Sequence, residues 1–248
     1  MSFFPRTKPI NSFFSHFCEH AHVFNPIQVS LLLNIDLSSY SLVPSTMRLS
    51  VGFLSLIALA VTAQDTNVRT VKRTFDAANI PTDLSITFDP TALLEVTFPE
   101  PNARPITIHA GQQLPRDSTA GPPTFNLRGS NSRGPFVVAA VDPDAPTPQE
   151  PTSAQIRHFL GGNFTPNGSG LLSNSTPALS EFRQPTPPAG SDAHRYIFLV
   201  FEQPDGFNDQ TVVTPATPVQ NFDISAFAGA VGLGNPIAGT FMLVAPAA

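Results

Sequence analysis

Residues 136–146 read FVVAAVDPDAP and combine an unbroken apolar run with a turn rich in proline and aspartate. Because every side chain from Phe136 to Val141 is apolar, the run predicts a strand that is buried on both faces of a sheet. The run stops at Asp142, and the two prolines that follow fix part of the turn backbone. The stretch therefore predicts a central strand that ends in two carboxylates, those of Asp142 and Asp144.

Two further apolar stretches indicate strands of the same kind. Residues 196–201 read YIFLVF, and residues 238–244 read AGTFMLV. The first is rich in the β-branched and aromatic residues that fit a pleated surface, and the second is expected to supply the last strand. Shorter extended segments are expected at residues 84–88, 93–98 and 105–109.

The composition also favours a β-dominated fold. The 248 residues include 27 prolines and 15 glycines, which interrupt helices, and 21 phenylalanines, which supply an aromatic core. Residues 112–123 and 163–190 are rich in turn-forming residues and are predicted to be loops. Helices are expected at residues 65–79 and 226–231. Their candidate N-caps are Asp65 or Thr66 for the first and Asp223 or Ser225 for the second.

Residues 47–63 have the pattern of a secretory signal peptide. An early arginine, Arg48, precedes an apolar run that ends in small residues, so cleavage before Gln64 is expected. The apolar run is shorter than the roughly 20 residues that span a bilayer, so no transmembrane anchor is predicted. Residues 1–46 show no sustained period. We interpret them as an extension upstream of a start at Met47, with a translated, disordered leader as the alternative.

The remaining composition agrees with secretion. The only cysteine is Cys18, so the predicted mature domain, residues 64–248, has neither thiol nor disulfide. Three sequons, at Asn163, Asn167 and Asn174, predict an exposed, glycosylated loop. The net charge of −5 gives no electrostatic reason to bind nucleic acid.

The turn after the central strand is the most polar turn in the sequence, and two histidines, His158 and His194, lie next to β-rich runs. Four interpretations of this set stay open. The carboxylates can simply bond to turn amides while the histidines pack in the core. Two carboxylates and two imidazoles can also bind a metal, but no short His-x-x-x-His spacing supports this. Acid–base catalysis lacks a nucleophile motif. The last interpretation is recognition of a phosphate-like anion, with a hydroxyl such as that of Tyr196.

Ordered motifs add a resemblance to a known family. Residues 141–146, followed by His158 and Phe159, resemble the first signature of the phosphatidylethanolamine-binding proteins, and residues 187–203 resemble the second. Residues 75–98 and 233–241 also follow the family pattern, so the resemblance covers nearly the whole predicted mature domain. It points to a secreted, fungal-type member.

The resemblance implies a central antiparallel sheet with a smaller second sheet and peripheral helices. It also implies a small pocket for phosphate or a phosphatidylethanolamine head group, and no catalytic residues, metal or cofactor. Two departures from the family pattern, Ser153 and Thr186, affect the fit of the ligand. The implied pocket residues are Asp142, His158, His194 and Tyr196, with Asp144 supporting the turn and Pro187 on the rim.

The resemblance also implies partners. Members of the family inhibit serine carboxypeptidases and other serine proteases, which makes inhibition the second functional hypothesis. Other members bind kinases, but a secretory route argues against a kinase partner. A hydrolase is the least favoured hypothesis, since no nucleophile with an adjacent base is evident. The protein is expected to be a monomer.

Overall fold

The computed structural model describes residues 65–247. The predicted extension, residues 1–46, and the predicted signal peptide, residues 47–63, lie outside the described residues. Within the described part of the chain, none of the helices has the length and apolar character needed to cross a membrane.

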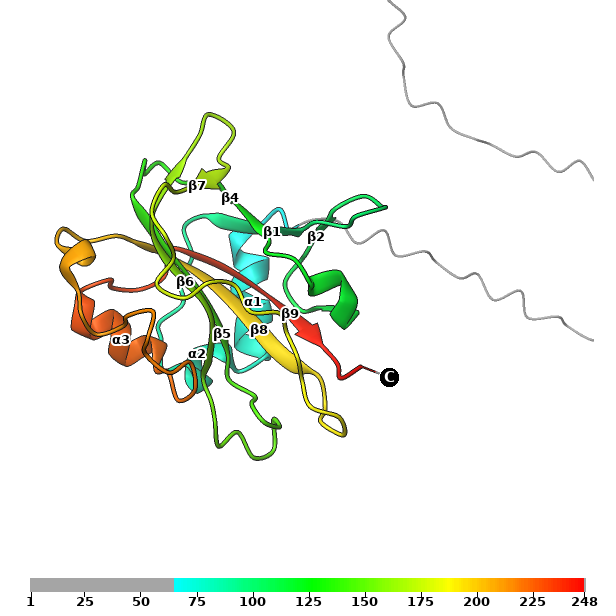
Figure 1. The fold of residues 1–248 in the computed structure, drawn as a ribbon. Coiled ribbons are helices and arrows are strands. Elements are labelled where there is room, and N and C mark those ends of the chain that lie inside the picture. Colours follow the sequence, from blue (N-terminus) through cyan, green and yellow to red (C-terminus); the bar gives the residue numbers. More distant parts are fainter. Residues whose placement is uncertain (1–64, 248) are drawn as a thin grey trace, which may run out of the picture. The chain divides into compact units, whose positions relative to one another are not determined.

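Residues 65–247 form two sheets with helices around them (Figure 1). The central sheet has the strand order β3-β9-β8-β5-β6-β7, and its strands are β3 (Gln112–Leu114), β5 (Phe136–Asp142), β6 (Ile156–Pro166), β7 (Leu172–Ser173), β8 (His194–Glu202) and β9 (Ala238–Val244). The smaller sheet has the order β2-β1-β4, with β1 (Leu93–Phe98), β2 (Ile106–Thr107) and β4 (Thr124–Arg128). The helices are α1 (Val68–Ala77), α2 (Ile80–Asp83) and α3 (Ile224–Val231), with 3₁₀ turns at Arg116–Thr119 and Phe207–Asp209.

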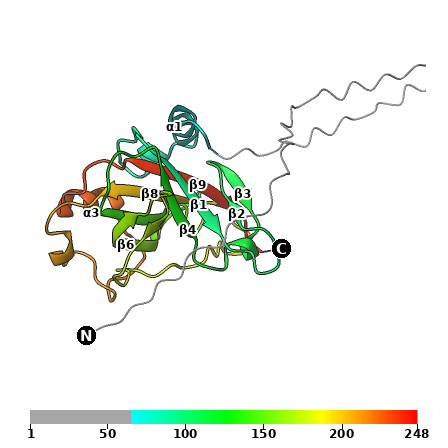
Figure 2. The ribbon, with the colours of Figure 1, turned by 90° about the horizontal axis from the view of Figure 1, so that it is seen from above.

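Strand β5 occupies the centre of the fold because both of its faces are apolar. Val137, Ala139 and Val141 pack into the cluster that contains the helices, whereas Val138 and Ala140 pack into the cluster beneath the smaller sheet. Figures 1 and 2 show β8 and β9 in the same layer. The mainly β fold with a second sheet is therefore confirmed. All pairs in the central sheet are antiparallel except β3 with β9, which is parallel.

Helix α1 covers one face of the central sheet through Phe75. The Phe75 ring stacks on Phe88 with centroids 4.0 Å apart and meets the edge of Phe241 at 5.3 Å. The helix begins later than expected, because Asn67, and not Asp65 or Thr66, caps it by accepting a hydrogen bond from the Arg69 amide. Helix α3 starts at the predicted cap, where Asp223 accepts from the Ala226 amide.

Several local predictions were wrong in extent. Residues 84–88 are not a strand; they connect α2 to β1 while burying Leu84 and Phe88 in the core. The predicted loop at residues 112–123 contains β3 and a 3₁₀ turn. The predicted loop at residues 163–190 contains the end of β6 and all of β7.

The sequence analysis missed strands β4 and β6. Strand β6 is obscured because it carries Arg157, His158 and two glycines in its middle. Its pairing with β5 is also irregular, since Ala140 pairs with Phe159 and Val141 with Arg157. His158 is thus the extra residue of a β-bulge, which bends the strand and redirects side chains.

Truncating Phe75 to alanine should lower the free energy of unfolding by about 3–5 kcal/mol, because the ring is fully buried between two other rings. Urea denaturation of the wild type and Phe75→Ala measures the difference. Val212→Ala is the control, since Val212 is 51% exposed and its truncation should change stability by less than about 0.5 kcal/mol. Equal effects of the two substitutions would contradict this account of the core.

Candidate functional site

Four of the predicted pocket residues converge at one end of the central sheet. Asp142 ends β5, and His194 and Tyr196 begin β8, which pairs with β5. His194 and Tyr196 share a face because alternate residues of a strand point the same way. His158 reaches this group from β6 through the bulge; its ring lies 5.0 Å from the Tyr196 ring, centroid to centroid.

The Asp142 carboxylate is the centre of the group and is almost completely buried. Its Oδ1 accepts a hydrogen bond of 2.7 Å from the Asp144 amide, which fixes the turn. Its Oδ2 lies 2.9 Å from His194 Nδ1 and 3.9 Å from His158 Nε2. One carboxylate oxygen therefore faces both imidazoles.

His194 is arranged as an imidazolium. Nδ1 faces the Asp142 carboxylate, and Nε2 lies 3.2 Å from the Pro146 carbonyl and 2.9 Å from Ser191 Oγ. A carboxylate and a carbonyl both require an N–H donor, so the doubly protonated ring satisfies both. Burial by itself lowers the pKa of His194, but the hydrogen bond and charge of Asp142 outweigh it and raise the pKa above its ordinary value.

His158 is arranged differently. Its Nδ1 lies 2.9 Å from the Arg183 carbonyl, which fixes a proton on Nδ1. Burial lowers the pKa of His158 below its ordinary value, even though the Arg183 carbonyl and Asp142 oppose this effect. The neutral ring then holds a lone pair on Nε2 beside Asp142. This nitrogen can take up a proton when an anion approaches.

Tyr196 contributes a phenol that stays neutral. Burial raises the pKa of Tyr196 far above its ordinary value, and the charge and hydrogen bonding of Asp142 raise it further. The hydroxyl is therefore a proton donor over the whole physiological range.

These residues line a cavity of about 510 Å³. Of the two departures from the family pattern, Thr186 lines the cavity and Ser153 does not. Pro187, predicted for the rim, is buried and is absent from the lining; the adjacent, exposed Pro188 lines the cavity in its place. The cavity is lined by Asp142, Ala145, Ile156, His158, Arg183, Gln184, Thr186, Pro188, His194, Tyr196, Val219 and Gln220.

Asp144 points away from the cavity and holds Arg195. Its two oxygens accept from Arg195 Nη2 at 2.6 Å and Nε at 3.0 Å. Arg195 Nη1 also donates to Asp83 and to the Ala78 carbonyl, so the network ties the turn to α1 and α2. The sequence analysis assigned Asp144 to support of the turn but missed Arg195, which alternates with His194 and Tyr196 and so faces the other way.

The three sequons have different surroundings. Asn163 is half-buried in β6, and its Nδ2 donates to Thr176 and Asn208. Asn174 is also half-buried, and its Nδ2 donates to the Gly162 carbonyl. Asn167 is exposed in the turn between β6 and β7; within the described residues its side chain forms hydrogen bonds through Oδ1 and none through Nδ2.

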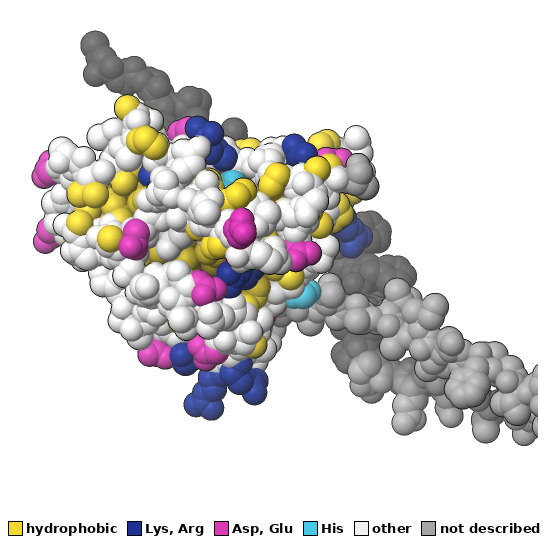
Figure 3. Space-filling model, turned by 90° about the horizontal axis from the view of Figure 1, so that it is seen from below, with side chains coloured by type: hydrophobic (Ala, Val, Ile, Leu, Met, Phe, Trp, Pro, Cys, Tyr) yellow, Lys and Arg dark blue, Asp and Glu magenta, His cyan; other side chains and the backbone are white. Residues whose placement is uncertain are grey.

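Figure 3 shows the face that carries the loops beside the ends of β5 and β8, and acidic and basic side chains are interspersed over it. Within residues 65–247, no group of three or more His, Cys, Asp or Glu side chains has the arrangement of a metal site. The third histidine of the described chain, His109, does not line the cavity.

The two site histidines should titrate in opposite directions from the ordinary value of about 6.5. NMR titration of the ring protons should place His194 above this value and His158 below it. Because the folded pKa of His194 is raised, its pair with Asp142 stabilises the fold fully below about pH 6.5. This stabilisation is lost as the pH rises through the folded pKa. A higher pKa for His158 than for His194 would contradict the assignment.

The comparisons agree with this architecture. The family model described as "Phosphatidylethanolamine-binding protein" matches residues 104–242. The chain is 30% identical over 162 residues to the "26 kDa secreted antigen" of Toxocara canis, covering 64% of this chain and 58% of the antigen. It is 26% identical over 154 residues to "Protein BROTHER of FT and TFL 1" of Arabidopsis thaliana, covering 62% of this chain and 80% of that protein. The match thus spans less than two thirds of the antigen.

Two solved structures share the fold. One is a chain from the crystal structure of carboxypeptidase Y inhibitor complexed with the cognate proteinase, with a TM-score of 0.62 and 20% identity, covering 73% of this chain and 97% of that one. The other is the phosphatidylethanolamine-binding protein from Plasmodium vivax, with a TM-score of 0.54 and 13% identity, covering 75% and 100%. Since the family model matches more than half of the 248 residues, the protein belongs to the phosphatidylethanolamine-binding protein family.

Proposed function

We propose that this protein is a secreted, monomeric binding protein, without catalytic activity, whose cavity holds phosphate or the phosphate of a phosphatidylethanolamine head group. The observation that carries the proposal is the cluster of Asp142, His158, His194 and Tyr196 around one cavity. Asp142 and His194 neutralise each other, so an entering anion meets no net negative charge from them.

The two site histidines differ in whether they can donate a hydrogen bond to the anion. Both ring nitrogens of His194 already have acceptors, so this ring positions Asp142 rather than the ligand. His158 Nε2 has no hydrogen-bond acceptor among residues 65–247, since the nearest carboxylate oxygen of Asp142 lies 3.9 Å away. Once protonated, this nitrogen donates to a phosphate oxygen. The exposed Arg183, which lines the same cavity, adds a positive charge. A bound anion and a proton on His158 therefore stabilise each other.

Anion affinity should increase as the pH falls below about 6.5. Burial lowers the pKa of His158, so the ring becomes protonated only below the pH at which a free imidazole does. Sulfate is the probe for this pH profile, since its own charge is constant over the range. Isothermal titration calorimetry at constant ionic strength measures the affinity.

His158→Ala should weaken phosphate binding about tenfold or more and flatten the sulfate profile, since a charge-assisted hydrogen bond contributes about 1.5–3 kcal/mol. His194→Ala should also weaken binding, because it leaves the buried Asp142 carboxylate without its imidazolium partner. Asp142→Ala should weaken binding because it removes the carboxylate that fixes both the turn and the His194 ring. His109→Ala is the matched control, because this histidine does not line the cavity. A pH-independent sulfate isotherm, or equal losses in His158→Ala and His109→Ala, would refute direct contact by His158.

Inhibition of a serine carboxypeptidase is the second candidate function. It is favoured by the fold shared with the chain from the carboxypeptidase Y inhibitor complex. Titration of a serine carboxypeptidase with the purified domain should reduce peptide hydrolysis. Inhibition should persist in His194→Ala, since the buried ring is only 1% exposed and cannot form much of a protein-binding surface. Undiminished hydrolysis at a large molar excess of the domain would reject this function.

Secretion is supported by the signal-peptide pattern at residues 47–63 and by similarity to an antigen described as secreted. The two relatives described above come from a nematode and a plant, so the fungal-type assignment stays a prediction. Of the three sequons, Asn167 is the acceptor that fits best, because a glycan there displaces no hydrogen bond made by its Nδ2.

Mass spectrometry of the secreted protein should therefore find an N-terminus at Gln64 and a glycan on Asn167. Asn167→Gln should remove the glycan mass, whereas Asn163→Gln should leave it unchanged. Peptides from residues 3–44 in mature material would disprove the proposed start at Met47.

A further inference from the structure

The central sheet buries a guanidinium that has no carboxylate partner among residues 65–247. Arg157 precedes His158 in β6 and is only 1% exposed. Its cation lies over the Phe222 ring, with Cζ 5.0 Å from the ring centroid. Burial lowers the pKa of Arg157, and the positive charge of Arg183 lowers it further. A buried cation without an anionic partner is energetically costly, and a negative charge bound close to it would offset part of that cost.

Within the described part of the chain, the groups that accept hydrogen bonds from Arg157 are all neutral. Its Nε donates to Ser180 Oγ at 2.6 Å, its Nη2 to the Thr217 carbonyl at 2.9 Å and its Nη1 to the Pro218 carbonyl at 3.3 Å. These acceptors come from two segments, residues 178–183 and residues 215–220. The buried guanidinium thus connects the two segments by hydrogen bonds.

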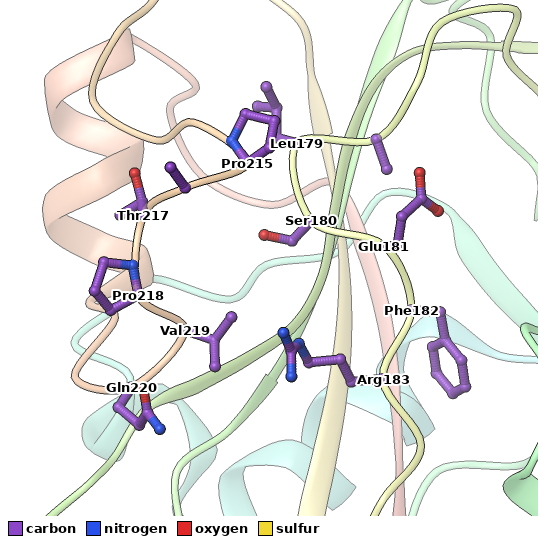
Figure 4. Close-up of a pocket in the computed structure, with 12 residues that line it drawn as sticks. Leu179, Ser180, Glu181, Phe182, Arg183, Pro215, Thr217, Pro218, Val219 and Gln220 are labelled. Atoms are coloured by element: carbon purple, nitrogen blue, oxygen red, sulfur yellow. The ribbon is translucent and has the colours of Figure 1, made fainter.

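The two segments form the walls of a groove of about 640 Å³. Figure 4 shows Ser180 and Arg183 extending from one wall toward Pro218 and Val219 of the other. The groove is separate from the cavity around Asp142, but the two share Arg183, Val219 and Gln220 in their linings.

The Ser180 hydroxyl lines this groove and is polarised by the positive charge of Arg157. Its oxygen accepts the Nε–H of Arg157, so its own proton is free to be donated, and it donates to no other group in the described part of the chain. A hydroxyl that accepts from a cation becomes a stronger donor, because hydrogen bonds in a chain polarise one another. The groove therefore presents a polarised O–H and the Arg183 guanidinium.

We infer that the groove between residues 178–183 and 215–220 is a second anion-binding site, at which a carboxylate or phosphate oxygen accepts from Ser180 Oγ and pairs with Arg183. The ligand supplies the negative charge that Arg157 lacks. Glu181 also lines the groove, but Figure 4 shows its side chain directed away from the space between the walls. The site recognises an oxyanion by charge and by one directional donor, a combination typical of anion sites.

Calorimetric titration with inorganic phosphate at constant ionic strength should therefore detect two binding events per chain. Ser180→Ala should weaken the groove event about tenfold or more, which corresponds to one charge-assisted hydrogen bond, and leave the cavity event unchanged. His158→Ala should do the reverse. Titration with acetate tests the carboxylate arm at the groove.

Controls separate the groove from general charge and from folding. Arg69→Gln removes one exposed positive charge from α1 and should leave both events intact. Arg157→Met should abolish the groove event; if this variant is unfolded by circular dichroism, Ser180→Ala alone decides. A single event that His158→Ala weakens would overturn the groove site while retaining the proposed function. A single event that only Ser180→Ala weakens would retain the groove site and reject the cavity.

Discussion

The burial of one carboxylate, that of Asp142, is the constraint on which the arrangement of the site depends. An ionised carboxylate without partners is very costly in an apolar interior, so each oxygen must be satisfied. The Asp144 amide satisfies one oxygen and the His194 ring satisfies the other. His194 in turn requires the Pro146 carbonyl. The turn after β5 and the start of β8 are thereby locked to each other.

This carboxylate can be buried only because the strand that carries it is covered on both faces. Strand β5 is buried along its whole length, between the helices and the smaller sheet. The cavity lies at the polar end of this strand. The apolar packing on the two faces ends there, while the strand still provides a rigid support for the side chains of the site. The bulge in β6 adds His158 to the same end without lengthening the strand pairing.

Three arginines lie near the polar end of β5, and each has a different role because each contacts different groups. Arg195 meets two carboxylates, so its charge is used inside the fold and holds α1 and α2 to the turn. Among residues 65–247, Arg157 donates to one hydroxyl and two carbonyls and to no carboxylate, so none of these residues compensates its charge behind the groove wall. Arg183 is exposed and lines both the cavity around Asp142 and the groove. The opposite pKa shifts of Arg195 and Arg157 reflect this difference in partners.

The sequence by itself determined the apolar strands β5, β8 and β9 and the acidic turn, because these depend on runs of neighbouring residues. Motif resemblance also identified Asp142, His158, His194 and Tyr196 as neighbours. Only the tertiary structure decided that β6 is a strand, since its central residues do not look β-like, and that Pro188 replaces Pro187 in the lining. It alone brought Arg157 to Ser180 and Thr217, which are 23 and 60 residues away, because such contacts depend on strand pairing and on the face that each side chain occupies.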